Sequence, residues 1–247
     1  MLDGLSQRRL APDTYHGYSG EINMDTQLIE EVIHDEQIEI DVRNAQRDLI
    51  ILKYMAWRLR SILYQLDQAE KQGSEQPLPR QVQERCGRNH RIVIYRQQEL
   101  LQLRSFAFVG FISKRKGVLQ PEVVEAIKQT DQKLVAELVH APSILSYSSL
   151  ELPGGDWCNL VVLADSGAKM HIKHSETHIH AAHHLAHDYY KWIRLHNGTM
   201  PEGLDPVEMR LLSTKYYTFH PDQQRPSLRE RTYGTRQVKE IKTRASQ

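Results

Sequence analysis

The residues best suited to chemistry gather in one short stretch, because seven of the 13 histidines lie between residues 170 and 190. They are His171, His174, His178, His180, His183, His184 and His187. On a helix, spacings of three and four residues bring neighbouring rings to about 5–6 Å at Cβ, close enough to share a metal ion. The stretch has no His-Glu-x-x-His motif, and only Glu176 and Asp188 offer nearby carboxylates. We therefore assign no metal ligands.

An apolar stripe indicates which histidines border the buried side of this predicted helix. The stripe consists of Ala168, Ile172, Ile179, Ala182, Ala186 and Tyr189. His171, His178 and His183 lie along its borders, and Asp165 or Ser166 is expected to cap the helix. Three interpretations stay open: an exposed histidine-rich surface, which the sequence favours, a transition-metal site, or border histidines that line a haem or ligand pocket.

The second half of the chain has the pattern of an α+β domain. Apolar runs bounded by glycine and proline predict strands over 105–112, 144–152, 157–163, 192–195 and 211–219. Pro121 opens a helix that Pro142 ends. With the histidine-rich helix, the order is βαββαβ, that of a ferredoxin-like domain, followed by one further strand.

Four segments carry a resemblance to a known family. They are Phe108-Val-Gly-Phe, Tyr147-Ser-Ser-Leu-Glu-Leu, Trp157-Cys-Asn-Leu-Val and Tyr189-Tyr-Lys-Trp-Ile-Arg-Leu-His196. Over residues 105–219 the chain resembles the dimeric α/β-barrel superfamily, and within it the antibiotic-biosynthesis-monooxygenase-like domains. The resemblance implies a sheet with two helices on one face and a second subunit's sheet on the other, hence a homodimer. It also implies a pocket for an apolar or aromatic small molecule between sheet and helices.

The same resemblance suggests a set of catalytic residues. Some such domains are cofactor-free oxygenases with a polar and aromatic set, others bind haem through a histidine on the second helix, and others only bind ligands. Trp157 and Asn159 are two residues apart on a predicted strand, so they share a face, and Tyr147 on the neighbouring strand can point the same way. The alternative is that these residues only pack the sheet. Haem stays open as a cofactor.

A long helix precedes this domain. Its apolar residues are spaced four and three apart, and they are Ile38, Val42, Ala45, Leu49, Leu52, Ala56, Leu59, Leu63 and Leu66. This seam predicts a helix of about nine turns. Its partner could be residues 79–104 returning as a helical hairpin, the same helix of another subunit, or the following domain. We expect a partner within the protein, because an exposed seam of this length favours aggregation.

Composition narrows the protein class. The 247 residues carry a net charge of +1, which gives no reason to expect nucleic acid. No apolar run approaches the roughly 18 residues of a transmembrane segment, and no signal peptide is recognised at the start. Two cysteines make no disulfide framework, so a cytoplasmic protein is expected.

These patterns predict four regions and two classes of function. The regions are an irregular segment over 1–27, a helical region over 28–104, the ferredoxin-like domain over 105–219 and a basic, flexible tail over 220–247. The favoured function is binding of an aromatic, polycyclic or haem-like small molecule, with monooxygenase-like catalysis as an extension. The alternative is a non-catalytic assembly protein that docks through the 38–66 helix and the basic tail.

Overall fold

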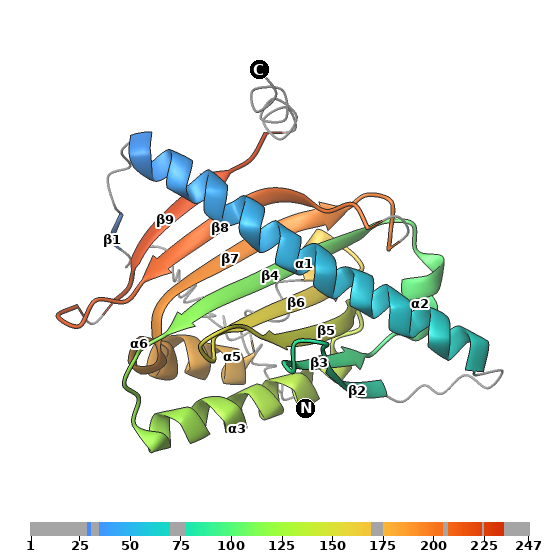
Figure 1. The fold of residues 1–247 in the computed structure, drawn as a ribbon, viewed down its shortest axis with the longest axis horizontal. Helices are drawn as coiled ribbons and strands as arrows, with labels where there is room; N and C mark the ends of the chain where they lie inside the picture. Colours follow the sequence, from blue (N-terminus) through green and yellow to red (C-terminus); the bar gives the residue numbers. More distant parts are fainter. Residues whose placement is uncertain are drawn as a thin grey trace, which may run out of the picture.

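A nine-stranded sheet organises the chain (Figure 1). The computed structural model describes residues 29–30, 35–69, 78–168, 175–204, 207–223 and 225–234. The strands are β1 (Ile29–Glu30), β2 (Leu78–Gln83), β3 (Asn89–Ile94), β4 (Phe106–Arg115), β5 (Ile144–Glu151), β6 (Trp157–Leu163), β7 (Tyr190–Met200), β8 (Arg210–Thr218) and β9 (Ser227–Thr232). Their order in the sheet is β1-β9-β8-β7-β4-β6-β5-β3-β2. Neighbouring strands are antiparallel except β1 and β9, which are parallel.

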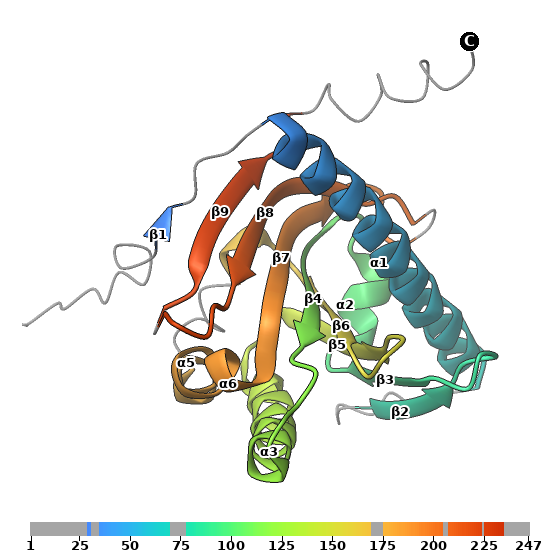
Figure 2. The same cartoon turned by 60° about the vertical axis from the view of Figure 1, so that its left-hand side comes forward.

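Helices cover both faces of the sheet (Figure 2). They are α1 (Asp35–Ala69), α2 (Gln97–Gln102), α3 (Pro121–Glu137), α5 (Glu176–His180) and α6 (Ala186–Tyr189), with the short turns η2 (Leu138–His140) and η3 (Ser166–Ala168) and the π-helical η4 (Ala181–Leu185). α1 crosses one face, while α3 and the segment from α5 to α6 lie on the other. Among the described residues, no helix is long and apolar enough to cross a membrane.

The predicted βαββαβ order is present in the middle of the chain. β4, α3, β5, β6, the segment from α5 to α6, and β7 follow one another along the sequence. In the sheet these four strands lie in the order β7-β4-β6-β5. The strand expected over 192–195 is longer in the structure, where β7 spans Tyr190–Met200. The further strand expected after it is β8. The α+β class is therefore confirmed, with an open and mainly antiparallel sheet.

The prediction of a helical return over 79–104 is wrong. These residues contain the hairpin of β2 and β3, followed by the six-residue helix α2. The hairpin turns at Gly87, whose φ is 78° and whose N–H donates to the Glu84 carbonyl at 2.7 Å. Ile92 then packs under α1 while Val93 packs on the opposite face. This alternation with period two is typical of a strand that is buried on both sides.

Part of the predicted flexible tail is also a strand. β9 lies within 220–247 and pairs with β8 from Ser213↔Thr232 to Thr218↔Ser227. The tail beyond residue 234 and the irregular segment expected over 1–27 lie outside the described residues.

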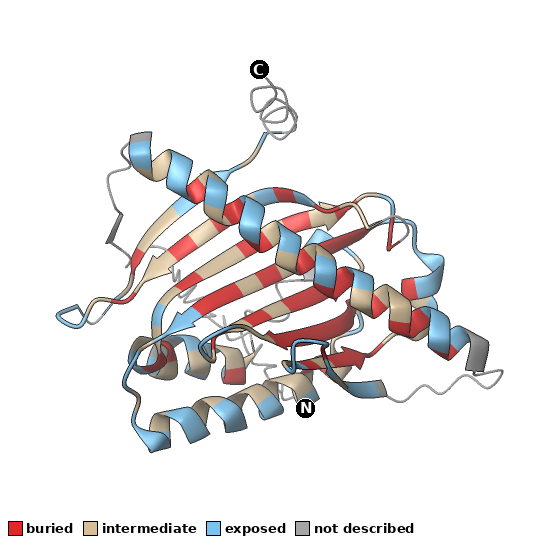
Figure 3. Ribbon diagram, viewed as in Figure 1, coloured by how far each residue is buried: buried red, intermediate tan, exposed pale blue. Residues whose placement is uncertain are grey.

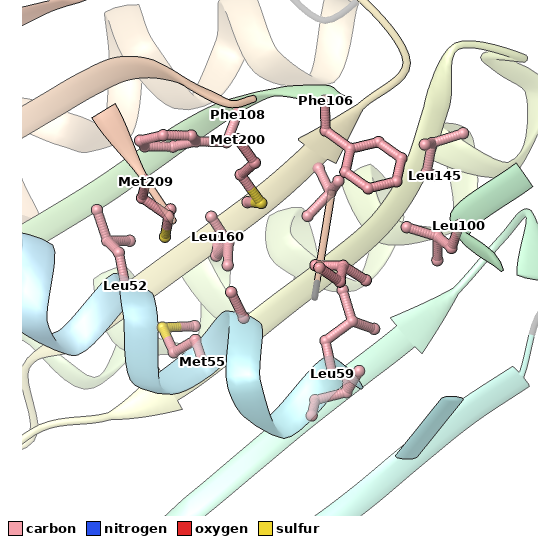
Figure 4. Close-up of a cluster of buried hydrophobic side chains, with 14 of the residues drawn as sticks. Leu52, Met55, Leu59, Leu100, Phe106, Phe108, Leu145, Leu160, Met200 and Met209 are labelled. Atoms are coloured by element: carbon pink, nitrogen blue, oxygen red, sulfur yellow. The ribbon is translucent and has the colours of Figure 1, made fainter. Parts of the chain in front are cut away.

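The long helix is confirmed, and it packs on the sheet of its own chain. α1 spans 35 residues. Its buried seam residues are Ala45, Leu52, Ala56, Leu59, Leu63 and Leu66. They share one core cluster with Phe108, Leu160 and Met200 (Figure 4). The backbone of β4 passes so close to the helix that a Cβ at Gly110 would lie 2.6 Å from Leu52 Cδ1.

This packing decides between the three partners considered for the helix. The following domain supplies the surface, and α1 covers the sheet face on which a second subunit's sheet was expected. Figure 3 shows that burial is concentrated in the central strands beneath the helix. On the opposite face, Leu134 and Val135 of α3 pack against a smaller cluster that includes Ala107 and Val161.

Replacing a central seam residue by aspartate should destabilise the fold sharply. Leu52→Asp or Leu59→Asp places an unpaired carboxylate where the leucine is fully buried. We expect the free energy of unfolding to fall by at least about 3 kcal/mol. Chemical denaturation followed by circular dichroism measures this, with Gln46→Asp on the exposed side of α1 as the matched control. Unchanged stability of both leucine variants would contradict the packing described for α1.

Candidate functional site

The three residues predicted on the sheet share one face. Cys158 is buried in the cluster under α1, so its neighbours Trp157 and Asn159 point to the other side, towards the face that α3 covers. Tyr147 pairs with Val161 across the sheet and belongs to the core cluster on that same face. The structure therefore places Trp157, Asn159 and Tyr147 on one face of the sheet, as the sequence predicted.

The side chain of Asp131 connects α3 to this face of the sheet. The Tyr147 hydroxyl donates to Asp131 Oδ1 at 2.9 Å, and Arg91 Nη2 donates to Asp131 Oδ2 at 2.6 Å. The Arg91 guanidinium lies 5.5 Å from the centroid of the Tyr147 ring. Burial, together with the Asp131 carboxylate, raises the pKa of Tyr147 well above its ordinary value. The phenol is therefore protonated at neutral pH and acts as a hydrogen-bond donor.

A row of side chains crosses this face perpendicular to the strands. Arg91 pairs with Ser149, Ser149 with Asn159, and Asn159 with Phe111. The Tyr190 ring meets the Phe111 ring edge-on, with centroids 5.7 Å apart. Arg91 Nε and Asn159 Oδ1 are both buried and have no hydrogen-bond partner among the described residues. Since buried polar atoms are nearly always bonded, these two atoms are candidate positions for polar groups that are not among the described residues.

The structure describes only one of the three border histidines in full. His171 lies outside the described residues, and the side chain of His183 does too. His178 lies in α5 and its Nδ1 is buried. It lines neither of the hollows described below.

The histidine-rich helix begins later than predicted. Its cap is Ser175, whose Oγ accepts a backbone N–H at 3.2 Å, and not Asp165 or Ser166. Asp165 instead accepts a backbone N–H in its own turn at 2.7 Å. Ser175 Oγ and Thr177 Oγ1 donate to the Glu137 carboxylate at 2.8 and 2.5 Å. These bonds hold the pKa of Glu137 below its ordinary value and fasten α5 to the end of α3.

The remaining described histidines serve the surface and the packing. The rings of His180 and His184 are exposed, with centroids 5.1 Å apart, as their spacing of four residues predicts. His187 Nε2 lies 3.2 Å from the His220 carbonyl oxygen and 2.9 Å from that of Gln223, so it ties the helix to the turn after β8. Among the described residues, no three His, Cys, Asp or Glu side chains lie close enough together to hold a metal ion.

The strongest polar contacts lie on the α1 face and were not predicted. Asp48 is 2 % exposed and accepts from Arg194 Nε and Nη2 at 2.5 and 2.8 Å. His196 Nε2 lies 2.9 Å from the same carboxylate, and its Nδ1 lies 2.8 Å from Thr214 Oγ1. Burial opposes the ionised form, but the bonds from His196 and Arg194 outweigh it and hold the pKa of Asp48 below its ordinary value.

A second buried carboxylate precedes Asp48 by two helical turns. Asp41 accepts from Gln37 Nε2 at 2.8 Å and from Arg229 Nη2 at 3.2 Å. The Tyr216 hydroxyl donates to the Asp41 carbonyl at 3.1 Å. A signal for both residues was present in the sequence, because two aspartates seven residues apart interrupt the buried face of an apolar helix.

A third carboxylate fixes the other half of the helix to the β2–β3 turn. Glu84 accepts from the Tyr54 hydroxyl and, at 3.1 Å, from Arg58 Nε. His90 Nδ1 lies 2.8 Å from the same carboxylate. Burial lowers the pKa of His90 in spite of the nearby Glu84. These contacts are structural, because they connect α1 to the sheet edge.

Two hollows on the surface of the described residues stand out, and neither is lined by Tyr147, Asn159 or Trp157. One, of about 240 Å³, is lined by Gln37, Asp41, Asn44, Trp192, Ile193, Arg194, Tyr216, Tyr217, Thr218 and Arg229. The other, of about 500 Å³, is lined by Arg60, Leu63, Tyr64, residues 100–104 and residues 201–204. In the first hollow, Gln37, Arg194 and Arg229 donate to the aspartates of α1. The second is apolar with a basic rim.

Comparison with known proteins identifies no relative of this chain. No protein-family model, no curated protein and no solved structure matches the chain. The functional argument therefore rests on the side chains and their geometry.

Asp48→Asn should destabilise the protein in a pH-dependent way. The amide leaves Arg194 and His196 without their buried anion, and breaking such a pair costs about 3–5 kcal/mol. Because the folded pKa of Asp48 is lowered, its contribution is complete at neutral pH and is lost as pH falls from about 4 through the folded pKa.

Denaturation of wild type and variant at pH 7 and at lower pH tests this expectation. The difference in unfolding free energy should shrink on acidification. Asp67→Asn, at an exposed position of α1, is the control and should match wild type throughout. A difference that stays constant with pH would show that Asp48 is not the ionised partner of these two bases.

Proposed function

We propose that the protein binds a small, flat, hydroxylated molecule in the layer between the sheet and the helices α3 and α5–α6. The observation that carries this proposal is the pair of buried, unpartnered polar atoms, Arg91 Nε and Asn159 Oδ1. Each unmade bond costs about 1–3 kcal/mol, so a ligand that bonds to either atom recovers that free energy. Arg91 Nε can donate to a ligand oxygen, and Asn159 Oδ1 can accept from a ligand hydroxyl.

The exposure of the side chains in this layer supports ligand binding, because some are buried while others reach solvent. Tyr147 is 3 % exposed and Ser149 is also buried, so they form a closed floor. Asn159 is half-buried, and the Asp131 and Arg91 side chains remain 34 % and 27 % exposed. The rim of the site therefore reaches solvent while its base is dry, as in most small-molecule sites.

The surrounding side chains indicate an aromatic ligand. Phe111, Tyr190 and Trp157 lie on the same face as Asn159, and their rings favour stacked or edge-on contact with another ring. Tyr147 is a positioning residue, because its protonated hydroxyl is directed at Asp131 and so holds the partner of Arg91. An oxygenase reaction of the kind that the resemblance implies would use the same residues.

The resemblance to α/β-barrel domains fits this proposal in part. The strand order β7-β4-β6-β5 with two helical segments on one face supports a ferredoxin-like core. We infer that one chain completes the site, because α1 lies where a dimeric barrel would place its second sheet. Haem is not included in the proposal, since the polar pair suits a hydroxylated ring.

A pair of probes that differ by one hydroxyl tests the proposal. The wild-type chain should bind 1-naphthol more tightly than naphthalene by about 5- to 150-fold, the equivalent of one bond to a buried group. Asn159→Leu keeps the side-chain volume but removes the acceptor, so we expect it to abolish this preference while naphthalene still binds. Equilibrium dialysis measures the four affinities.

Asn197→Leu is the matched control. Asn197 is half-buried on β7 and its Nδ2 donates to Ser213 Oγ at 3.4 Å, so its loss should leave the preference intact. Failure of the wild-type chain to bind either probe, or an equal preference in wild type and Asn159→Leu, would refute this site.

A further inference from the structure

α1 carries a second apolar stripe on the side that faces away from the sheet. Ile50, Tyr54, Trp57 and Tyr64 are 68, 38, 49 and 45 % exposed. With Ser61 they repeat the four-and-three spacing of the buried seam, so they form one continuous line along the helix. Exposed large apolar residues are normally scattered, whereas a line of them marks a contact surface.

The aromatic rings of this outward stripe are held in place before any partner arrives. The Tyr54 hydroxyl donates to the Glu84 carboxylate, and the Tyr54 and Trp57 ring centroids are 6.1 Å apart. The Arg58 guanidinium lies 5.9 Å from the Trp57 ring centroid. Fixed rings lose little rotamer freedom on association, which favours binding at this surface.

The apolar surface continues beside the second half of α1. Tyr64 lines the hollow of about 500 Å³, and two further rim residues, Leu101 and Leu103, are also exposed. The charged residues that line this hollow are Arg60, Arg104 and Glu202, so bases outnumber acids there. A partner that packs along the outward stripe would therefore also contact the leucines and arginines of this hollow.

We propose that a second copy of this chain docks here, with the two α1 helices antiparallel across a two-fold axis. Two-fold contacts require a self-complementary surface. The charges along this surface provide one, because Glu36 and Glu39 lie at the start of α1 while Arg60 and Arg104 line the hollow beside its second half. In the antiparallel arrangement, each acidic start lies beside the basic hollow of the other copy.

The arginines in the first half of the stripe favour the same direction. Arg43 and Arg47 are exposed on the outward side of α1, in line with Ile50. Parallel helices would place arginine against arginine in the contact, which is unfavourable. Antiparallel helices place these arginines against the aromatic half that contains Trp57 and Tyr64, where cation–π contacts stabilise them.

The mass in solution tests this docking directly. At tens of micromolar, light scattering of the full chain should give twice the chain mass of 28.7 kDa. Trp57→Glu and Arg47→Glu, each alone, should lower the dimer affinity at least tenfold with an unchanged circular-dichroism spectrum. Val118→Glu, at a position 89 % exposed outside α1, should remain dimeric.

A crosslinking experiment tests the direction of the helices. In a Cys86→Ser background, chains with Gln46→Cys are mixed with chains with Ser61→Cys and treated with a bismaleimide of about 10 Å span. Antiparallel helices bring these positions together, whereas parallel helices separate them by about 22 Å. We expect mixed crosslinked dimers. The proposal would be overturned by a monomeric wild type, or by a dimer that Trp57→Glu and Arg47→Glu leave unaffected. Crosslinks only between identical variants would also overturn it. So would a monomer that binds lipid vesicles through Trp57.

Discussion

Buried charge between α1 and the sheet is the constraint on which the rest of the structure depends. Taking a carboxylate or a guanidinium out of water costs several kcal/mol, so Asp48 is tolerated only because Arg194 and His196 meet it together. The apolar seam supplies most of the adhesion, at about 1.5–3 kcal/mol for each fully buried large side chain. The ion pairs fix the position of α1 along the sheet. A shift of α1 by one turn would leave Asp48 and Asp41 buried without partners, so the helix has one allowed position.

This position determines what each side of the sheet can do. Because α1 fills one face, the sheet needs no second subunit to bury its core, and the proposed ligand site lies on the face under α3. Because α1 is anchored along its inner side, its outer stripe with Trp57 is presented to solvent in a fixed orientation. One helix thus closes a core on one side and presents the proposed docking surface on the other. The two proposals, ligand binding and self-association, therefore involve separate surfaces.

β6 links the two faces. Its residues alternate, so that Cys158 and Leu160 pack under α1 while Trp157 and Asn159 face the proposed site. The rigidity of the site therefore comes from the packing on the reverse side of the same strand. Asp131 adds the only described link from α3 to the row at Arg91, and it holds that arginine through a bond of 2.6 Å. The buried floor and charged edge of the proposed site both depend on this strand, which packs on its two faces.

The sequence by itself determined the features that depend on local backbone geometry. Periods of 3.5 and 2 residues predicted α1, the order of the central strands, and the shared face of Trp157 and Asn159, because these repeats follow from helix and strand geometry alone. The β2–β3 hairpin was missed, since the basic run around Gly87 interrupted its alternation. Burial of Asp48 and Asp41 was decided only by the tertiary structure, because their partners Arg194 and Arg229 lie 146 and 188 residues further along the chain. The unpartnered Asn159 oxygen was likewise unpredictable, since whether a side-chain atom is satisfied depends on neighbours that only the folded sheet and α3 bring to it.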